Sequence, residues 1–354
     1  MKRILYIGWI GFNNLGDELL WNLFKDTCGK YFTKDQIDIT PSVPGIDLNK
    51  IESYNTVILG GGSLLLPGYL EILQDAIRKG KSVIIWGSGL DWIEKRNLDL
   101  LAENKLDSME QNFKQKDIEV LDEVIEKALF VGVRGPLTKK AIEIMIGHEK
   151  AKKVEIIGDP GLLLQEPAVG IVKENLIGIN WGTTFNRLYG GNEKLVEKQL
   201  VEAAKKLIQQ GYKILLYTVW PTDTPYCERL YKAINDPANV VLDKKLYKEQ
   251  ELMKVLSKCK ATINFKLHAN YLSLTAKTPA IALGYRFKVF DNAAMLGFQD
   301  LVVSTDSAQI TQEILNCIEA IEKNGTKIIR EYQSTKKKYT PLLESIFTNS
   351  LLNK

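Results

Sequence analysis

Runs of apolar residues alternate with amphipathic segments along the whole chain. Most of the apolar runs are continuous, which is typical of strands buried on both faces of a parallel sheet. In the first half they predict strands at Ile4–Ile7, Thr56–Leu59, Val83–Trp86, Leu129–Val133 and Val154–Ile157. A helical period between them predicts helices at Glu18–Thr27, at Tyr69–Lys79 and across the charged segment Asn97–Lys127.

The alternation stops once and then restarts. The segment Leu162–Asn175 carries Pro167 and Gly170, and it is interpreted as a linker. Beyond it, apolar runs predict strands at Leu176–Asn180, Ile214–Val219, Val240–Leu242, Ala261–Phe265 and Ala280–Leu283. Amphipathic runs predict helices at Lys194–Gln210, Leu252–Cys259, His268–Ala276 and Ala308–Lys323.

This pattern predicts an α/β protein built from two Rossmann-like, doubly wound parallel-sheet domains that face each other across a cleft. The expected divisions are an N-terminal domain at 1–165, a C-terminal domain at 166–330, and a segment at 331–354 that packs back on the N-terminal domain. A length of 354 residues exceeds what one core usually supports. Because ligands bind beyond the carboxyl ends of parallel strands, we expect the site between the two sheets.

The composition is that of a globular protein, with 45% hydrophobic and 25% charged residues. The net charge of +4 comes without a clustered basic stripe, so we expect no nucleic-acid partner. One basic stretch, Lys323–Tyr339, is either a solvated or loose connection or a peripheral contact with an anionic membrane. Cysteines without ligand spacing, no bilayer-spanning run and an N-terminus that resembles a strand more than a signal peptide predict a cytoplasmic protein.

Glycine and charged side chains gather where the predicted strands end. The first strand leads into "GWIGFNNLGDELL" and the second into "GGGSLL". Cations follow later strands, as do carboxylates and one of the two histidines. Glycine lets a backbone approach a ligand closely, although such turns are also rich in glycine without any ligand. Cations beside helix N-termini favour an anionic ligand.

Two groups of residues allow both a structural and a functional interpretation. His268 lies at a strand-to-helix turn beside Lys266, and it is either a structural histidine or an acid–base group that titrates near neutral pH. Asn13, Asn14 and Asp17 either cap the first helix or bind the hydroxyls of a ligand. No histidine, cysteine and carboxylate spacing fits a metal site, so we expect no metal.

Taken together and in order, several fragments resemble a known family. They are "GWIGFNNLGDE" (Gly8–Glu18), "LGGGSL" (Leu59–Leu64), "VRGPLT" (Val133–Thr138), "GDPGL" (Gly158–Leu162) and "KLHANYLSLTAKTPAIALGYRFKV" (Lys266–Val289). The chain resembles the polysaccharide pyruvyl transferases from about Gly8 to Lys288. The resemblance implies a GT-B fold and transfer of pyruvate from phosphoenolpyruvate to a sugar of a cell-surface polysaccharide or its precursor, as a cyclic ketal.

The resemblance also implies roles for particular residues. The donor-binding cations would be Arg134, Lys266 and Lys288, and Arg286 would be a further candidate. His268 would be the acid, Asp17 the base and Asp159 a second candidate base. Asn13, Asn14, Gly61 and Gly62 would lie on the acceptor side. Phosphoenolpyruvate would be a co-substrate without any further cofactor, and the saccharide acceptor would be free or lipid-linked, at the inner face of the membrane in the second case.

The chain departs from the family pattern in two places. Lys266 stands where the family usually has arginine, and the strand end "INWGTT" lacks the arginine expected near it. Lysine is a point charge that cannot grip a carboxylate or phosphate with two parallel hydrogen bonds, so the exchange is not neutral. Two alternatives therefore stay open. One is a GT-B glycosyltransferase that uses a nucleotide sugar, although "HANYLSLTAKTP" has no carboxylate, and the other is a saccharide-binding protein without catalysis.

Overall fold

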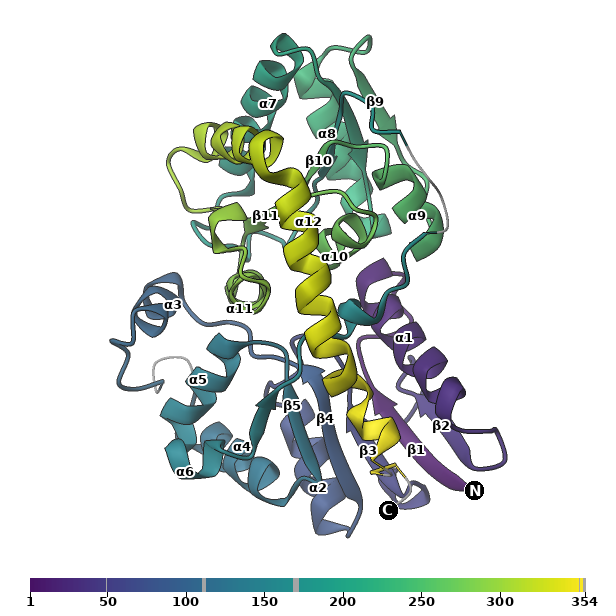
Figure 1. Ribbon diagram of the computed structural model, residues 1–354. Helices are drawn as coiled ribbons and strands as arrows, with labels where there is room; N and C mark the ends of the chain where they lie inside the picture. The colour runs from purple at the N-terminus through teal and green to yellow at the C-terminus, as the bar shows by residue number, and fades with distance from the viewer. Residues whose placement is uncertain (49, 110–112, 168–171, 350, 353–354) are drawn as a thin grey trace.

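Two six-stranded parallel sheets, each covered by helices, make up two domains of the computed structural model (Figure 1). The structure describes residues 1–48, 50–109, 113–167, 172–349 and 351–352. The first sheet has the order β2-β1-β3-β4-β5-β6. Its strands are β1 (Lys2–Ile7), β2 (Ile37–Pro41), β3 (Thr56–Leu59), β4 (Ser82–Ser88), β5 (Phe130–Val133) and β6 (Val154–Ile156).

The second sheet has the order β12-β11-β10-β7-β8-β9. Its strands are β7 (Leu176–Asn180), β8 (Lys213–Tyr217), β9 (Val240–Asp243), β10 (Ala261–Asn264), β11 (Ala280–Gly284) and β12 (Val302–Ser304). The continuous apolar strands are buried as predicted; β3, for example, is buried at all four positions. The fold class predicted from the sequence is thereby confirmed.

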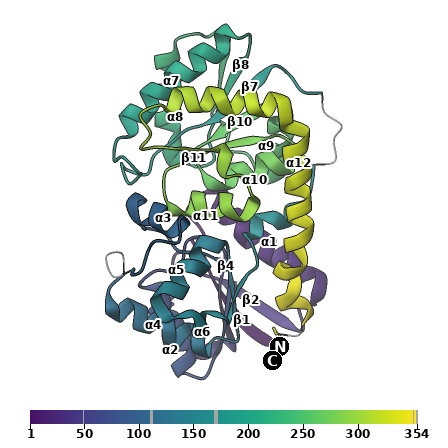
Figure 2. The same cartoon turned by 60° about the vertical axis from the view of Figure 1, so that its left-hand side comes forward.

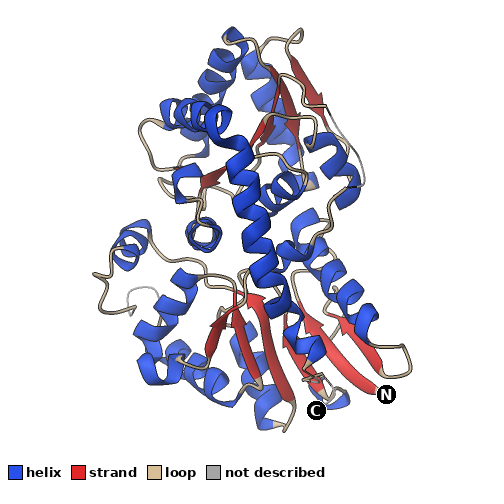
Figure 3. Ribbon diagram, viewed as in Figure 1, coloured by secondary structure: helices blue, strands red, loops and turns tan. Residues whose placement is uncertain are grey.

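Helices lie on both sides of each sheet (Figure 3). Those of the first domain are α1 (Leu15–Tyr31), α2 (Tyr69–Arg78), α3 (Lys95–Ala102), α4 (Gln115–Lys127), α5 (Pro136–Ile146) and α6 (His148–Ala151). Those of the second domain are α7 (Glu193–Gln209), α8 (Thr224–Ile234), α9 (Glu249–Leu256), α10 (Leu267–Thr275) and α11 (Phe287–Leu296). Short 3-10 turns are η1 (Ile51–Ser53), η2 (Pro160–Leu163), η3 (Pro221–Asp223) and η4 (Gln299–Leu301).

Several boundaries differ from the prediction. The charged segment Asn97–Lys127 is not one helix, because α3 ends before Asn104, whose φ of 60° lies in the left-handed region, and α4 begins only at Gln115. Residues 110–112 of that segment lie outside the described residues. The predicted linker begins as η2, and its residues 168–171 lie outside the described residues as well. Strands β2 and β12 were not predicted, since both are short strands at the edge of a sheet.

The last helix, α12 (Ile310–Thr348), is 39 residues long and much longer than predicted. The basic stretch Lys323–Tyr339 is therefore helical and not a loose connection. Figures 1 and 2 show α12 leaving the second domain, bending, and running along the first, so that the end of α12 lies near the first sheet. There Trp86 Nε1 donates to the carbonyl of Leu343 at 2.9 Å. No helix in the described part of the chain has an apolar run that could cross a bilayer.

The strand orders locate a switch point in each sheet. The chain goes outward from β1 to β2 and then continues on the other side at β3, and it likewise leaves β7 for β8 and β9 before it continues at β10. At such a point the loops at the carboxyl ends of two adjacent strands diverge and leave a crevice for a ligand. The loops that follow β1, β3, β7 and β10 are therefore the ones that position a site.

Candidate functional site

One cleft of about 310 Å³ lies between the domains, at both switch points. Its walls are formed by the loops after β1, β3, β4, β5, β7, β8, β10 and β11. Most of the predicted site residues line it: Asn14, Asp17, Gly62, Arg134, Lys266, His268, Arg286 and Lys288. Asn13, Gly61 and Asp159 do not line it. Sequence positions more than 250 residues apart therefore meet in one place.

His268 stands in the first turn of α10 with a buried carboxylate behind it. Its side chain is 12% exposed, and its Nε2 lies 3.5 Å from Oδ1 of the fully buried Asp159. The same carboxylate oxygen accepts a hydrogen bond from the backbone N–H of Gly161 at 2.8 Å. Burial alone would raise the pKa of Asp159, but His268, Arg134 and the Gly161 N–H outweigh it and hold that pKa below its usual value. Asp159 is thus an ionised group that orients the imidazole.

This burial does not support Asp159 as a base toward a ligand. Its side chain has no exposed surface and takes no part in lining the cleft. An acid–base group must come within hydrogen-bond reach of the proton it moves. Asp159 could therefore affect a ligand only through His268, as a positioning residue.

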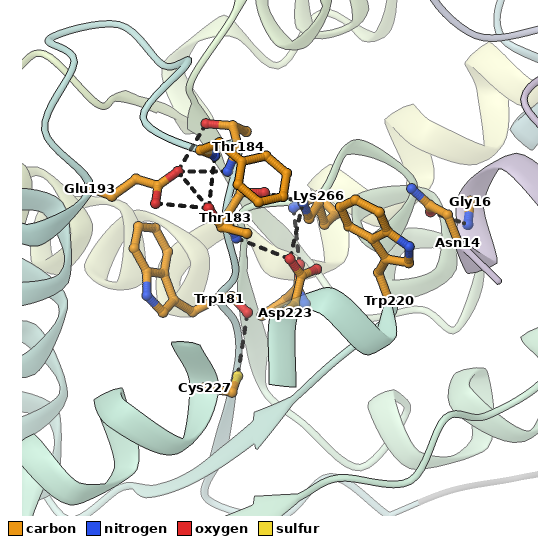
Figure 4. Close-up of polar contacts among 12 residues, drawn as sticks. Asn14, Gly16, Trp181, Thr183, Thr184, Glu193, Trp220, Asp223, Cys227 and Lys266 are labelled. Atoms are coloured by element: carbon orange, nitrogen blue, oxygen red, sulfur yellow. Dashed lines mark hydrogen bonds and ion pairs between the residues drawn. The ribbon is translucent and has the colours of Figure 1, made fainter. Parts of the chain in front are cut away.

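The N-terminus of α1 packs directly against the other side of His268. Gly16 lies so close that a Cβ there would overlap Nδ1 of the imidazole. Asn14 caps the helix, since its Oδ1 accepts from the Gly16 N–H at 3.1 Å (Figure 4). The backbone N–H of Leu15 donates to the carbonyl of Val219 at 3.0 Å, which ties this helix start to the second domain. Asn14 therefore has the predicted capping role and also faces the cleft.

Replacing Gly16 by alanine should displace His268, whereas the same replacement at Gly29 in the same helix should not. The added methyl must push either the imidazole or the helix start away, and misplacement by about 1 Å can cost on the order of a hundredfold in rate. We expect a similar loss, from Gly16→Ala, of the activity that the resemblance implies. Gly29→Ala is the matched control, because Gly29 is also in α1 but has open space around its Cβ position. It should gain about 0.5–1 kcal/mol in unfolding free energy and keep its activity. Equal activities of the two variants would contradict the idea that activity depends on the position of His268.

Asp17 follows in the first turn of α1, half-buried and facing the cleft. Burial raises the pKa of its carboxyl, and the nearby basic groups His268, Lys288 and Lys266 oppose that rise. A carboxylate whose pKa is raised accepts a proton more readily than an ordinary one. The position and the pKa direction together suit a base.

Two of the predicted donor-binding cations are already paired with buried carboxylates. Lys266 Nζ lies 3.2 Å from Asp223 Oδ1 and donates to the carbonyl of Thr183 at 2.8 Å (Figure 4). Arg286 lies 3.3 Å from Asp91 Oδ2, and its guanidinium carbon is 4.4 Å from the ring centre of Trp92. Both cations stiffen the wall of the cleft, but their charges are largely compensated there. Among the described residues, Lys288 has no carboxylate within ion-pair distance.

Arg134 is a fully buried cation beneath the glycine-rich turn after β3. Its guanidinium donates to the carbonyl of Gly62 and to Ser63 Oγ, both at 3.3 Å. It also lies 3.9 Å from Asp159 and 3.9 Å from Asp291. With no exposed surface, Arg134 shapes the floor of the cleft more than it offers charge to a ligand.

Asp291 joins the two domains at this floor. It belongs to α11 of the second domain, yet its carboxylate accepts from the backbone N–H groups of Leu137 and Thr138 and from Thr138 Oγ1, at 2.9, 3.1 and 2.6 Å. It thereby caps α5 of the first domain, whose own N-cap, Gly135, provides no side chain. A Cβ on Gly135 would overlap the carboxylate. The fragment "RGPLT" is thus an interdomain contact.

The comparison with known proteins agrees with this geometry. Residues 14–286 match the family model described as polysaccharide pyruvyl transferase. The chain belongs to the polysaccharide pyruvyl transferase family. A relative in Erwinia amylovora, described as amylovoran biosynthesis protein AmsJ, is 23% identical over 276 residues, which cover 73% of this chain and 63% of the relative. This pyruvyl transferase family member thus spans somewhat less than two thirds of that relative's length.

Solved structures of low sequence identity share the GT-B-like fold. The complex of S. aureus MnaA with UDP superposes with a TM-score of 0.63 at 10% identity and covers 99% of this chain and 96% of that one. UDP-GlcNAc 2-epimerase from Neisseria meningitidis gives 0.58 at 12% identity over 100% of both chains. A UDP-glucosyltransferase from Polygonum tinctorium gives 0.58 at 12% identity over 99% and 98%. At such identities the likeness shows the fold alone.

Tyr285 and Arg187 are among the residues lining the cleft of this pyruvyl transferase family member that sequence reasoning did not single out. Tyr285 is 2% exposed; burial would raise the pKa of its phenol, but Lys288, Arg286 and Lys266 outweigh that and lower it. Arg187 lines the cleft from the loop after β7. Tyr285 is indistinguishable by sequence from a core aromatic, and Arg187 lies well past its strand end. Within the described ranges, no cluster of three or more histidine, cysteine or acidic side chains is placed to hold a metal.

Proposed function

We propose that this chain transfers pyruvate from phosphoenolpyruvate to a sugar of a cell-surface polysaccharide or its precursor, as a cyclic ketal. The observation that carries the proposal is the dyad of His268 and buried Asp159, placed beside an interdomain cleft that Lys288 also lines. Family membership supports the reaction class. The second domain would bind the donor, and the first would bind the acceptor.

Donor binding must be mostly ionic, because phosphoenolpyruvate is small and carries almost three negative charges. Lys288 has no carboxylate within ion-pair distance in the described part of the chain, and Lys266 and Arg286 add to the positive potential of the same wall. Hydrogen bonds to charged groups contribute about 1.5–3 kcal/mol each, so two or three would support micromolar to millimolar affinity. In this proposal Arg134 holds the floor in place and does not contact the donor.

The chemistry adds two sugar hydroxyls to C2 of the donor. His268 delivers a proton to the methylene carbon, which becomes the methyl group, while the first hydroxyl oxygen bonds to C2 and gives its proton to Asp17. The C2–O bond to phosphate then breaks, and phosphate leaves with the bonding electrons. The second hydroxyl oxygen bonds to C2 and gives its proton to His268, which has lost its own in the first step. General acid–base catalysis of this kind contributes typically about a hundredfold to ten-thousandfold.

The acceptor side offers aromatic and amide groups suited to a pyranose. Trp9 lines the cleft with half of its surface exposed, and its ring centre lies 5.3 Å from that of Phe12. Asn13 has a φ of 56°, is exposed, and stays an expectation for hydroxyl binding, as does Asn14. Gly62 lines the cleft, whereas Gly61 packs against Pro160. We place the reaction in the cytoplasm, on a free or lipid-linked acceptor; recovery of the chain only from outside the cell would contradict this.

Thermal unfolding with candidate donors tests the proposal. A ligand at a hundred times its dissociation constant stabilises a protein by about 2.7 kcal/mol, which is a readily measured shift. Phosphoenolpyruvate should stabilise the wild type, and Lys288→Ala should lose most of that shift. Lys194→Ala removes the charge of an exposed lysine that does not line the cleft, so it should keep the shift.

Other outcomes of this experiment would support one of the two alternative functions. Stabilisation by UDP- or GDP-sugars alone would replace the proposal with a nucleotide-sugar glycosyltransferase. Stabilisation by neither donor would favour a saccharide-binding protein without catalysis. Asp17→Asn separates the two sides of the site, because it should keep the phosphoenolpyruvate shift but lose the transfer of pyruvate. A full transfer rate in that variant would remove Asp17 as the base.

A further inference from the structure

The cations of the second-domain wall do not contribute equally to an anion site. Lys266 and Arg286 each lie within 3.3 Å of a buried carboxylate, on Asp223 and Asp91 respectively. Lys288 and Arg187 also line the cleft, and among the residues that the structure describes neither has a carboxylate within 4.0 Å. Phosphoenolpyruvate carries two anionic groups, a phosphate and a carboxylate. One lysine is too little to compensate both.

Arg187 belongs to a loop between β7 and α7 whose conformation is fixed by several hydrogen bonds. Glu193, 4% exposed, receives hydrogen bonds from Thr183 Oγ1 and from the N–H and hydroxyl of Thr184, at 2.6–3.1 Å (Figure 4). The same carboxylate accepts from the backbone N–H of Asn186 at 3.0 Å. In return, Asn186 Oδ1 accepts from the N–H of Glu193 at 3.1 Å. The carboxylate of Glu193 thus holds the backbone segment that precedes Arg187.

The conformation of this loop is one that bulky residues rarely adopt. Phe185 and Asn186 both have φ of 58°, and Phe185 is 61% exposed, so it gains little from packing. Such backbone persists only where its surroundings enforce it, and it is found most often at binding and catalytic sites. The enforcing contacts are those of Glu193 together with Asp223 Oδ1, which accepts from the Thr183 N–H at 3.0 Å.

Lys266 takes part in the same support. Its ammonium bridges Asp223 and the carbonyl of Thr183, so it anchors the start of the loop while its own charge is compensated. A lysine at this position therefore holds the loop, and the guanidinium that could grip an oxyanion with two parallel hydrogen bonds is that of Arg187.

We propose that Arg187 is a donor-binding residue, which together with Lys288 binds the two anionic groups of phosphoenolpyruvate, and that Glu193 positions it. This inference rests on the proposed function above. Arg187 contacts either the phosphate or the carboxylate, since a guanidinium recognises both in the same way.

The test measures affinity for phosphoenolpyruvate by thermal shift or calorimetry in Arg187→Ala, Arg187→Lys and Glu193→Gln. Loss of a charged hydrogen bond corresponds to about a tenfold to hundredfold weaker affinity, and we expect that range for Arg187→Ala. Lysine should restore only part of it, because it lacks the planar fork. Lys194→Ala is the matched control, since it removes an exposed cation from the next helix without touching the cleft.

Inorganic phosphate as a second probe separates the two contacts. If Arg187→Ala weakens phosphoenolpyruvate but not phosphate, the guanidinium binds the carboxylate; if it weakens both, it binds the phosphate; both results support the inference. Wild-type affinity in Arg187→Ala, beside a loss in Lys288→Ala, would overturn the role of Arg187 and leave the proposed function standing. No phosphoenolpyruvate binding by the wild type would overturn both.

Discussion

His268→Ala should lower pyruvyl transfer by about a hundredfold to ten-thousandfold, with the fold unchanged. The imidazole lies between the N-terminus of α1 and the buried Asp159, and it borders the cleft with only a small exposed area. Its removal takes away the proton donor but leaves Lys288 and the rest of the donor wall in place. We therefore expect the thermal shift with phosphoenolpyruvate to persist in the variant while phosphate release falls. Release would be followed with the saccharide fraction of the host's cell envelope as acceptor.

Two further variants distinguish this role from a general loss of structure. His148→Ala changes the other histidine, which is exposed on α6 and paired with Glu143, and it should leave transfer unchanged. Asp159→Asn keeps the size of the positioning group but removes the charge that faces Nε2, so it should lower the rate in the same direction as His268→Ala. The assignment fails if His268→Ala retains most of its phosphate release, or if it loses donor binding and release in equal proportion.

The sequence located the site by a simple physical rule. Continuous apolar runs mark the strands of buried parallel sheets, and the ends of those strands mark where ligands bind, so His268, Lys288 and Asp17 could be placed in one cleft before any contact was known. The rule depends only on local pattern. It therefore predicted most of the strands, and residues next to those strands line the cleft, but it missed the short edge strands β2 and β12.

What the sequence could not provide was the pairing of charges between distant segments. Lys266 and Arg286 looked like free cations because their partners, Asp223 and Asp91, are 43 and 195 positions away. Arg134 looked like a ligand-binding residue, yet it lies buried between carboxylates from both domains. Neither the burial of a single charged side chain nor its pairing with a distant one leaves a periodic pattern in the sequence. Only the three-dimensional arrangement shows that, among the described residues, Lys288 and Arg187 line the cleft without a carboxylate within 4.0 Å, which is why we propose them as donor-binding residues.

Asp291→Ala should produce the largest loss of stability, on the order of 3 kcal/mol in the free energy of unfolding. The change removes the acceptor of three hydrogen bonds from the start of α5 and leaves Arg134 with one buried carboxylate fewer. Burial raises the pKa of Asp291, against the opposing effects of Arg134 and Thr138, so the negative charge itself is poorly compensated there. The hydrogen bonds therefore contribute more to stability than the charge does.

That reasoning predicts a smaller loss of unfolding free energy when residue 291 keeps an acceptor oxygen but loses its negative charge. Asp291→Asn can still accept from the N–H groups of α5, and we expect a loss of about 1 kcal/mol. Asp300→Ala is the control, since Asp300 is exposed just beyond the end of α11 and forms no ion pair among the described residues. Urea unfolding would give all three values. Because Asp291 joins the two domains, its alanine variant should also broaden the transition as the domains begin to unfold separately. A stability within about 0.5 kcal/mol of the wild type in Asp291→Ala would show that the capping contact between the domains is not what holds them together.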